Sequence, residues 1–162
     1  MKIENLPFRA PELIKSIELK AQIFEVNKGD EILRQGQYIK VIPIVLSGAI
    51  SVYRRDNEGN EVFLYTIEPS ETCAMTLQSY QMSEPSQIFA KAITVTKLLT
   101  VSIENSSKWM DEFQEWKHFV FNSYNSRFQE LIHTIDSIAF QKLDTRLLSY
   151  LKDYSNTIKV NI

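Results

Sequence analysis

The side chains that could carry chemistry are few: one cysteine, two histidines and one pair of closely spaced carboxylates. Cys73 could serve as a redox switch, but no cationic residue flanks it to favour the thiolate. A lone cysteine is more often a small buried apolar residue, and we expect that role here. Glu68 and Glu71 could work as an acid and a base, yet both fall in a predicted loop that would not hold them in a fixed geometry.

The two histidines, His118 and His133, fall on one predicted helix. About four helical turns separate them, which is too far for both to bind one metal ion. Metal-dependent jelly-roll enzymes use several His and carboxylate ligands on their strands, and the strand region of this sequence has no histidine. The sequence also lacks a phosphate-binding glycine loop and a nucleophile elbow. We therefore expect no catalysis and no metal, and a metal-dependent jelly-roll enzyme is the least favoured alternative.

Short apolar runs separated by glycines predict a series of strands. Three of the four glycines, Gly29, Gly36 and Gly48, lie between such runs in the segment that starts at Phe24. Glycine is favoured at these corners because it adopts the positive φ that tight turns need. Strands of this kind close on themselves, so the expected fold is mainly β with α, a double-stranded β-helix or jelly-roll barrel. Barrels of this type are often cups for small ligands.

Local patterns predict further elements around this series. Residues Ala10–Leu19 favour a short helix, since Pro11 suits a first turn and the apolar residues share one face. Asp56–Asn60 is the clearest hairpin turn. Pro43 indicates an edge strand or a bulge, because proline cannot donate to a strand ladder. Phe89–Ser102 is rich in Thr, Val and Ile and predicts one more strand.

Length and composition favour an ordinary globular protein. The chain has 162 residues, 44% hydrophobic residues and a formal net charge of −2, which is enough for one domain with a sizeable core. Its longest apolar run, Val41–Leu46, is far shorter than the roughly 20 residues of a membrane helix, and the first residues lack the features of a signal peptide. No basic stripe is available to neutralise nucleic-acid phosphates. We expect a cytoplasmic protein that contacts no membrane and does not bind nucleic acid through this segment.

Helical patterns begin at Ile103. Residues 104–110 predict a short helix, and a long helix follows that starts between Asp111 and Trp116. Apolar residues of the long helix alternate at spacings of three and four, which defines a heptad seam. The seam consists of Phe121, Tyr124, Phe128, Leu131, Ile135 and Ile138.

This seam has two interpretations. The long helix could pack on its own β-domain, which needs only one apolar stripe, or it could form a parallel coiled coil with a second copy of the chain. A second stripe of Phe113, Trp116, Val120 and Ile132 lies beside the seam, so one stripe can face the β-domain while the other faces a partner. We expect a homodimer with the seam as its interface, although mixed seam residues do not specify the number of helices.

The last part of the chain predicts a shorter helix and a strand. Asp144 is a candidate N-cap followed by leucines at helical spacing, so residues 140–143 would form a hinge. Residues 157–162 alternate like a strand without a partner, which indicates a fragment of a longer protein. The expected domains are a β-barrel with an N-terminal helix over 1–110, a dimerisation helix over 111–141, and a hinge helix with a linker over 142–162.

A glycine-cornered barrel followed by a long helix and a hinged shorter helix resembles the Crp/Fnr family of bacterial transcription regulators. The segments that carry the resemblance are KGD at 28–30, SG at 47–48, EPSET at 68–72 and IAFQKLDTRLLSYL at 138–151. The resemblance implies the effector-sensing and dimerisation module of such a regulator. It also implies DNA binding through a winged helix-turn-helix that would follow this chain. A regulatory barrel without DNA binding, as in cyclic-nucleotide-gated channels and kinases, is the alternative.

In that family a cassette binds cyclic AMP: a glycine and a glutamate open it, and an arginine clamps the phosphate. By resemblance, Ser70 takes the glycine position and Glu71 the glutamate position, while Ser86, with Gln87 beside it, takes the arginine position. Neither Ser86 nor Gln87 carries a charge. Such a site lacks the charge-assisted hydrogen bond of ~1.5–3 kcal/mol and the bidentate geometry that arginine offers a phosphate. We therefore do not expect cyclic nucleotide as a ligand.

The resemblance also implies a base-contacting polar pair on the dimer helix, near Leu131 and Ile132, which are both apolar here. The cup could be filled by its own side chains or hold a different small effector, and an uncharged cassette favours a neutral or cationic one. A bound effector would contact the helix around Phe128. The expected ligand-binding residues are Glu71, Thr72, Cys73, Ala74, Ser86, Gln87, Phe128, Leu131 and Ile132.

Overall fold

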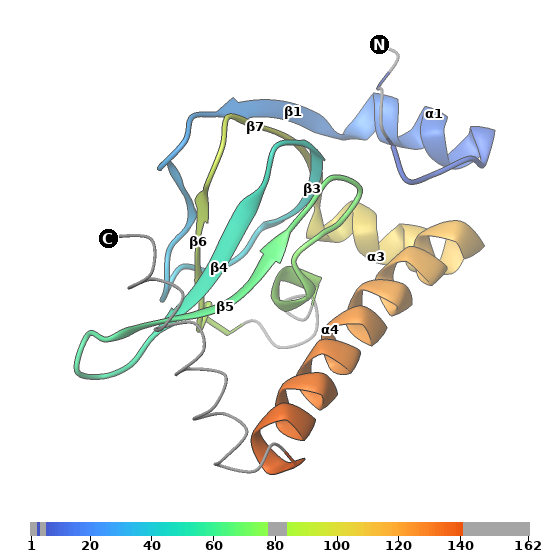
Figure 1. Cartoon of the computed structure of the whole chain (residues 1–162). Coiled ribbons are helices and arrows are strands. Elements are labelled where there is room, and N and C mark those ends of the chain that lie inside the picture. Colours follow the sequence, from blue (N-terminus) through green and yellow to red (C-terminus); the bar gives the residue numbers. More distant parts are fainter. Residues whose placement is uncertain (1–2, 4–5, 78–83, 141–162) are drawn as a thin grey trace, which may run out of the picture. The chain divides into compact units, whose positions relative to one another are not determined.

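The computed structural model describes residues 3, 6–77 and 84–140. The chain divides into two compact units, Met1–Tyr124 and Asn125–Ile162. In chain order the elements are α1 (Pro11–Lys20), β1 (Gln22–Val26), β2 (Glu31–Leu33), β3 (Val41–Ser47), β4 (Ile50–Arg55), β5 (Glu61–Ile67), β6 (Phe89–Ala92), β7 (Thr96–Ser102), α3 (Ile103–Glu112) and α4 (Gln114–Phe140) (Figure 1). The predicted hinge helix from Asp144 and the predicted strand over 157–162 lie outside the described residues.

The strands form two antiparallel sheets, with the orders β1-β7-β3 and β2-β6-β4-β5 (Figure 1). This arrangement confirms a mainly β fold with helices that fits a jelly roll. The expected closure into a barrel is wrong, because β1 and β3 end one sheet while β2 and β5 end the other. Pro43 lies on the edge strand β3, as its missing N–H predicts.

The expected single strand Phe89–Ser102 is in fact two strands, β6 and β7, which belong to different sheets. The chain crosses between the sheets at residues 93–95, where Ile93 and Val95 are exposed. These apolar β-branched side chains gave the segment its continuous strand-like composition. No glycine or proline marks the crossing, so the sequence pattern concealed it.

Gly48 lies in the turn between β3 and β4, where it packs closely against this crossing. Its φ is +83°, and a Cβ atom there would lie 2.7 Å from the Cα of Thr96 and closer still to the Val95 carbonyl oxygen. The Thr96 hydroxyl accepts a hydrogen bond from the Ala49 backbone N–H at 3.2 Å. Gly29 and Gly36 also have positive φ, so all three predicted corners are confirmed.

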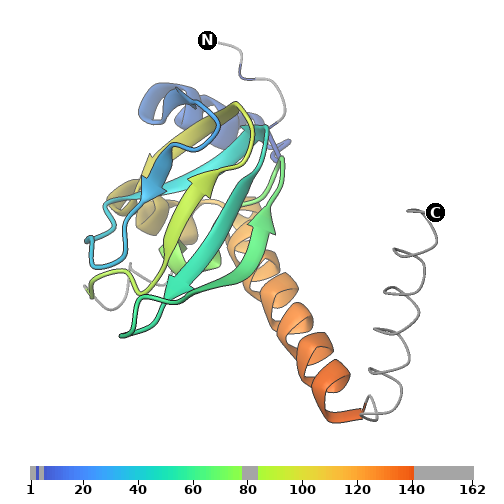
Figure 2. The same cartoon turned by 60° about the vertical axis from the view of Figure 1, so that its left-hand side comes forward.

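The core consists of two apolar clusters, one on each face of the sheet β1-β7-β3. Ile44 and Leu46 of β3 contribute to a cluster with α1, α3 and the start of α4. Val45, between them, points to the opposite side and joins the cluster that fills the space between the two sheets. Figure 2 shows the strands in front of α1 and α3, in keeping with this layered arrangement.

The described helices agree with the sequence patterns. α1 and α3 match the predicted helices within two residues at each end, and α4 begins at Gln114, inside the predicted interval. The Ser102 hydroxyl caps α3 by accepting the Asn105 N–H at 3.2 Å. Glu115, on α4, accepts the backbone N–H groups of Arg9 and Ala10, both at 2.8 Å, and so serves the start of α1, which has no side-chain cap of its own.

The predicted hairpin turn joins β4 to β5. Asp56 accepts hydrogen bonds from the backbone N–H groups of Glu58 and Asn60 and from the Asn60 side chain, all at 2.9 Å. These hydrogen bonds, first that of the Asn60 side chain, lower the pKa of the Asp56 carboxyl. The Asp56 carboxylate is therefore committed to the turn.

Candidate ligand-binding site

The loop after β5 is fastened to the free edge of β3. The Ser70 N–H donates to the Val45 carbonyl at 2.8 Å, and the Val45 N–H donates to the Glu71 carbonyl at 3.0 Å. The Thr72 hydroxyl donates to the Pro43 carbonyl at 2.6 Å. The loop thus covers an edge strand whose backbone groups would otherwise lack partners.

Ser70 takes the cassette position at which glycine is expected, and its backbone conformation shows the reason. Its φ is +70°, the only positive φ of a non-glycine residue in the described chain, and such a conformation costs an L-residue roughly 1–2 kcal/mol. One carboxylate oxygen of Glu71, next to it, accepts the Glu68 N–H at 3.0 Å. The carboxylate predicted to hold a ligand therefore already stabilises its own loop.

The next three predicted site residues, Thr72, Cys73 and Ala74, are buried. Cys73 belongs to the cluster between the sheets, where its sulfur lies 3.4 Å from the Tyr65 hydroxyl. Burial raises the pKa of the Tyr124 phenol, and nearby Cys73 adds to this effect. This environment agrees with the expected role of Cys73 as a small core residue.

Ser86 does not offer its hydroxyl to a ligand. The Ser86 hydroxyl donates to the Ile88 carbonyl at 2.9 Å and accepts the Ile88 N–H at 3.2 Å. The backbone of Ser86 pairs with Gly36 and Gln37 across the neighbouring loop. Gln87, in contrast, is exposed. Of the two residues at the arginine position, only Gln87 has an available side chain.

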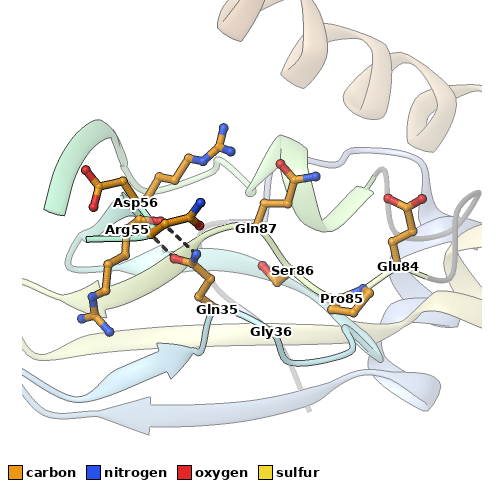
Figure 3. A pocket seen from close by; sticks show the side chains of 10 residues that line it. Gln35, Gly36, Arg55, Asp56, Glu84, Pro85, Ser86 and Gln87 are labelled. Atoms are coloured by element: carbon orange, nitrogen blue, oxygen red, sulfur yellow. Dashed lines mark hydrogen bonds between the residues drawn. The ribbon is translucent and has the colours of Figure 1, made fainter. Parts of the chain in front are cut away.

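A hollow of about 760 Å³ lies beside Ser86 and Gln87 (Figure 3). This volume falls within the range of ~300–1,000 Å³ typical of small-molecule pockets. Three segments line it: Gln35 and Gly36 after β2, residues 54–57 of the hairpin, and residues 84–87 before β6. Glu71, Thr72, Cys73 and Ala74 are not among its lining residues, so the hollow unites only two of the six predicted cassette residues.

The sequence pattern does not predict that the hairpin contributes to this hollow. Gln35 accepts the Arg55 N–H and donates to the Arg55 carbonyl, both at 3.0 Å, which joins two of the lining segments (Figure 3). The consecutive arginines Arg54 and Arg55 before the turn were the available signal. Their role depends on the pairing of β4 with β6, which sequence spacing alone does not reveal.

The predicted seam is an exposed apolar face of α4. Exposed fractions are 58% for Phe121, 38% for Tyr124 and 59% for Phe128, and Leu131 and Ile135 are also exposed. The side chain of Ile138 lies outside the described residues. Ile132 is exposed as well, and the ligand contacts expected for Phe128, Leu131 and Ile132 stay predictions.

Part of the second stripe packs on the β-domain. Trp116 is fully buried and Val120 nearly so, and Phe113 packs against the same cluster. Trp116 contacts Trp109 edge-on, with ring centroids 5.0 Å apart. The first turns of α4 therefore use this stripe to join the β-domain, whereas most of the seam is exposed.

The described chain thus combines two antiparallel sheets, a loop fastened to the edge of β3 and a long helix with an exposed apolar face. Residues 23–112 match the family model of the cyclic nucleotide-binding domain. The chain belongs to this cyclic nucleotide-binding domain family. None of the curated proteins compared with the chain matches it.

Solved structures of transcription regulators share the fold. The catabolite activator protein of Thermus thermophilus is 21% identical with a TM-score of 0.67; the match covers 84% of this chain and 63% of that one. A putative regulator of the Crp/Fnr family from Eubacterium rectale is 20% identical with a TM-score of 0.73, over 96% and 73%. The c-di-GMP-responsive global regulator of Xanthomonas campestris is 14% identical with a TM-score of 0.72, over 88% and 70%.

These identities show a common fold and leave the ligand open. Within residues 3, 6–77 and 84–140, no three His, Cys, Asp or Glu side chains come together in a group that could hold a metal ion. Among the described helices, none combines the length and the apolar character needed to cross a membrane.

Proposed function

We propose that this chain is the effector-sensing and dimerisation module of a Crp/Fnr-like transcription regulator, and that it is a cytoplasmic homodimer without enzymatic activity. The proposal rests mainly on α4, where part of one apolar stripe packs on the β-domain and the other stripe is exposed. The shared fold of solved Crp/Fnr regulators supports it. Contact with DNA would belong to a separate domain of the regulator.

The same proposal holds that cyclic AMP is not the effector. The position of the phosphate-clamping arginine falls on Ser86, whose hydroxyl is already hydrogen-bonded to Ile88. The Glu71 carboxylate stabilises its own loop through the Glu68 N–H. A ligand that did bind would act by favouring one of two arrangements of the paired helices, since an effector shifts an equilibrium only by its differential affinity.

The mass of the chain in solution tests the dimer. We expect light scattering at micromolar concentration to give twice the chain mass of 18.9 kDa. Burying the seam side chains could stabilise a dimer by ~10 kcal/mol per chain as an upper bound, against an association cost of ~4–15 kcal/mol. A mass equal to one chain over the whole accessible concentration range would contradict the proposal and favour a regulatory domain that acts alone.

A further inference from the structure

We infer that Arg54 makes the hollow beside Ser86 an anion-binding site, with the positive charge supplied by strand β4 instead of the cassette. The occupant would be a small molecule with a single carboxylate or phosphate group. The inference deepens the proposed sensing function, on which its biological meaning rests, although the anion site can be measured without it.

Strand alternation directs Arg54 toward the interior side of its sheet. Ile50 and Val52 belong to the cluster between the two sheets. Tyr53 lies on the opposite, outer face, where its ring stacks on Phe89 at 5.3 Å, and Arg55 covers the same Phe89 ring at 4.8 Å. Because successive residues of a strand point to opposite faces, Arg54 lies on the same face as Val52, but it is exposed where Val52 is buried.

Arg54 is exposed, and its side chain has no partner among the described residues. It lines the hollow, and no hydrogen bond or ion pair joins its guanidinium to another described residue. The neighbouring Arg55 lines the same hollow, but it forms an ion pair with Glu61 and lies over the Phe89 ring. Arg54 is therefore the guanidinium of this hairpin that is available to a ligand.

Two carboxylates line the hollow together with Arg54, and they limit what can bind there. The Asp56 carboxylate is committed to three hydrogen bonds of the turn. Glu84 has no such partner in the described chain, and in the view of Figure 3 it lies at the opposite end of the lining from Asp56, with Gln87 between them. A lining with one available cation and one available carboxylate suits a single anionic group and disfavours a polyanion.

Gln87 supplies a second contact for such a group. Its exposed amide lines the same hollow as Arg54. An amide N–H can donate to an anion that a guanidinium holds, and hydrogen bonds to charged groups are the stronger ones. The site thus combines one charge and one neutral donor from two different segments of the chain.

The test is a nuclear magnetic resonance titration of the full chain with inorganic phosphate and, separately, with acetate, each against chloride at equal ionic strength. We expect saturable shifts of the Ser86 and Gln87 amides with at least one of the two anions. Arg54→Gln should weaken that binding by at least about tenfold, since it removes a charge-assisted hydrogen bond. The matched control is Arg9→Gln, which removes another exposed arginine far along the chain from the hollow.

Three results would overturn the inference: no saturable shift with either anion, shifts centred away from residues 84–87, or equal weakening by Arg54→Gln and Arg9→Gln. The anion that shifts these amides tells a carboxylate effector from a phosphate effector. A chain that remains a dimer but binds neither anion would refute the anion site alone. A monomeric chain that binds through Arg54 would refute the proposed dimer module alone.

Discussion

We expect Phe128→Glu to convert the proposed homodimer of this chain into monomers. Phe128 is 59% exposed at the middle of the apolar face of α4. In a parallel pair of helices this position faces its own copy, so Phe128→Glu would place two like charges opposite each other. Losing the burial of each Phe costs about 1.5–3 kcal/mol per chain before any repulsion, which corresponds to at least two orders of magnitude in the dimer dissociation constant. Light scattering should then give the mass of one chain.

The control for this substitution is Ser126→Glu. Ser126 is exposed on the same helix, two residues before Phe128, at the heptad position that points furthest from the seam. It adds the same charge and should leave the dimer mass unchanged, while circular dichroism shows that both variants keep their helix content. A dimeric Phe128→Glu protein would show that the seam is not the interface, and so would a monomeric Ser126→Glu protein.

Gly48→Ala will be the most damaging of the glycine substitutions in the described chain. A positive φ costs an alanine roughly 1–2 kcal/mol, and the new Cβ would collide with the backbone of Val95 and Thr96. Overpacking of this kind costs ~1–3 kcal/mol more. For a chain of this length each kcal/mol lowers Tm by roughly 2–4 °C, so we expect a decrease of about 5–15 °C in a thermal melt.

Gly59→Ala is the matched control for Gly48→Ala. Gly59 has nearly the same φ, +89°, but a Cβ atom there would meet nothing within 4 Å. It should therefore show the backbone cost alone, reduced by the lower entropy of the unfolded alanine chain, ~0.4–1 kcal/mol. Because Tm of a dimer depends on concentration, all three proteins are compared at one concentration. Equal decreases for the two variants would show that the contact of Gly48 with the crossing at 93–95 is unimportant.

The local elements of this fold were predictable because their signals are local. Glycines with positive φ mark the corners, Pro43 marks an edge strand, and the Asp56 turn carries its own hydrogen-bond acceptors. The crossing between β6 and β7 was not predictable, because Ile93 and Val95 keep the composition of a strand where the chain leaves the sheet. Which sheet each strand joins depends on contacts between residues far apart in the sequence, and spacing does not encode these.

The candidate site was predictable only in part, for a related reason. The sequence directed attention to residues 70–74 and 86–87, but the first group is fastened to β3 and largely buried. Only Ser86 and Gln87 line the hollow, and the cation beside them comes from the hairpin. From the cassette alone a neutral or cationic effector was favoured, whereas Arg54 favours a small anion. The difference arises because the pairing of β4 with β6 brings Arg54 to the hollow.

Calorimetric titration of the purified chain with cyclic AMP, extended to millimolar nucleotide, tests the account most directly. With Ser86 and Glu71 committed to their own loops and a single free guanidinium on β4, we expect a dissociation constant no tighter than about 1 mM, equivalent to roughly −4 kcal/mol. A micromolar dissociation constant, accompanied by a normal dimer mass, would contradict the account. It would mean that the cassette binds cyclic nucleotide without its arginine and that the module is a nucleotide sensor after all.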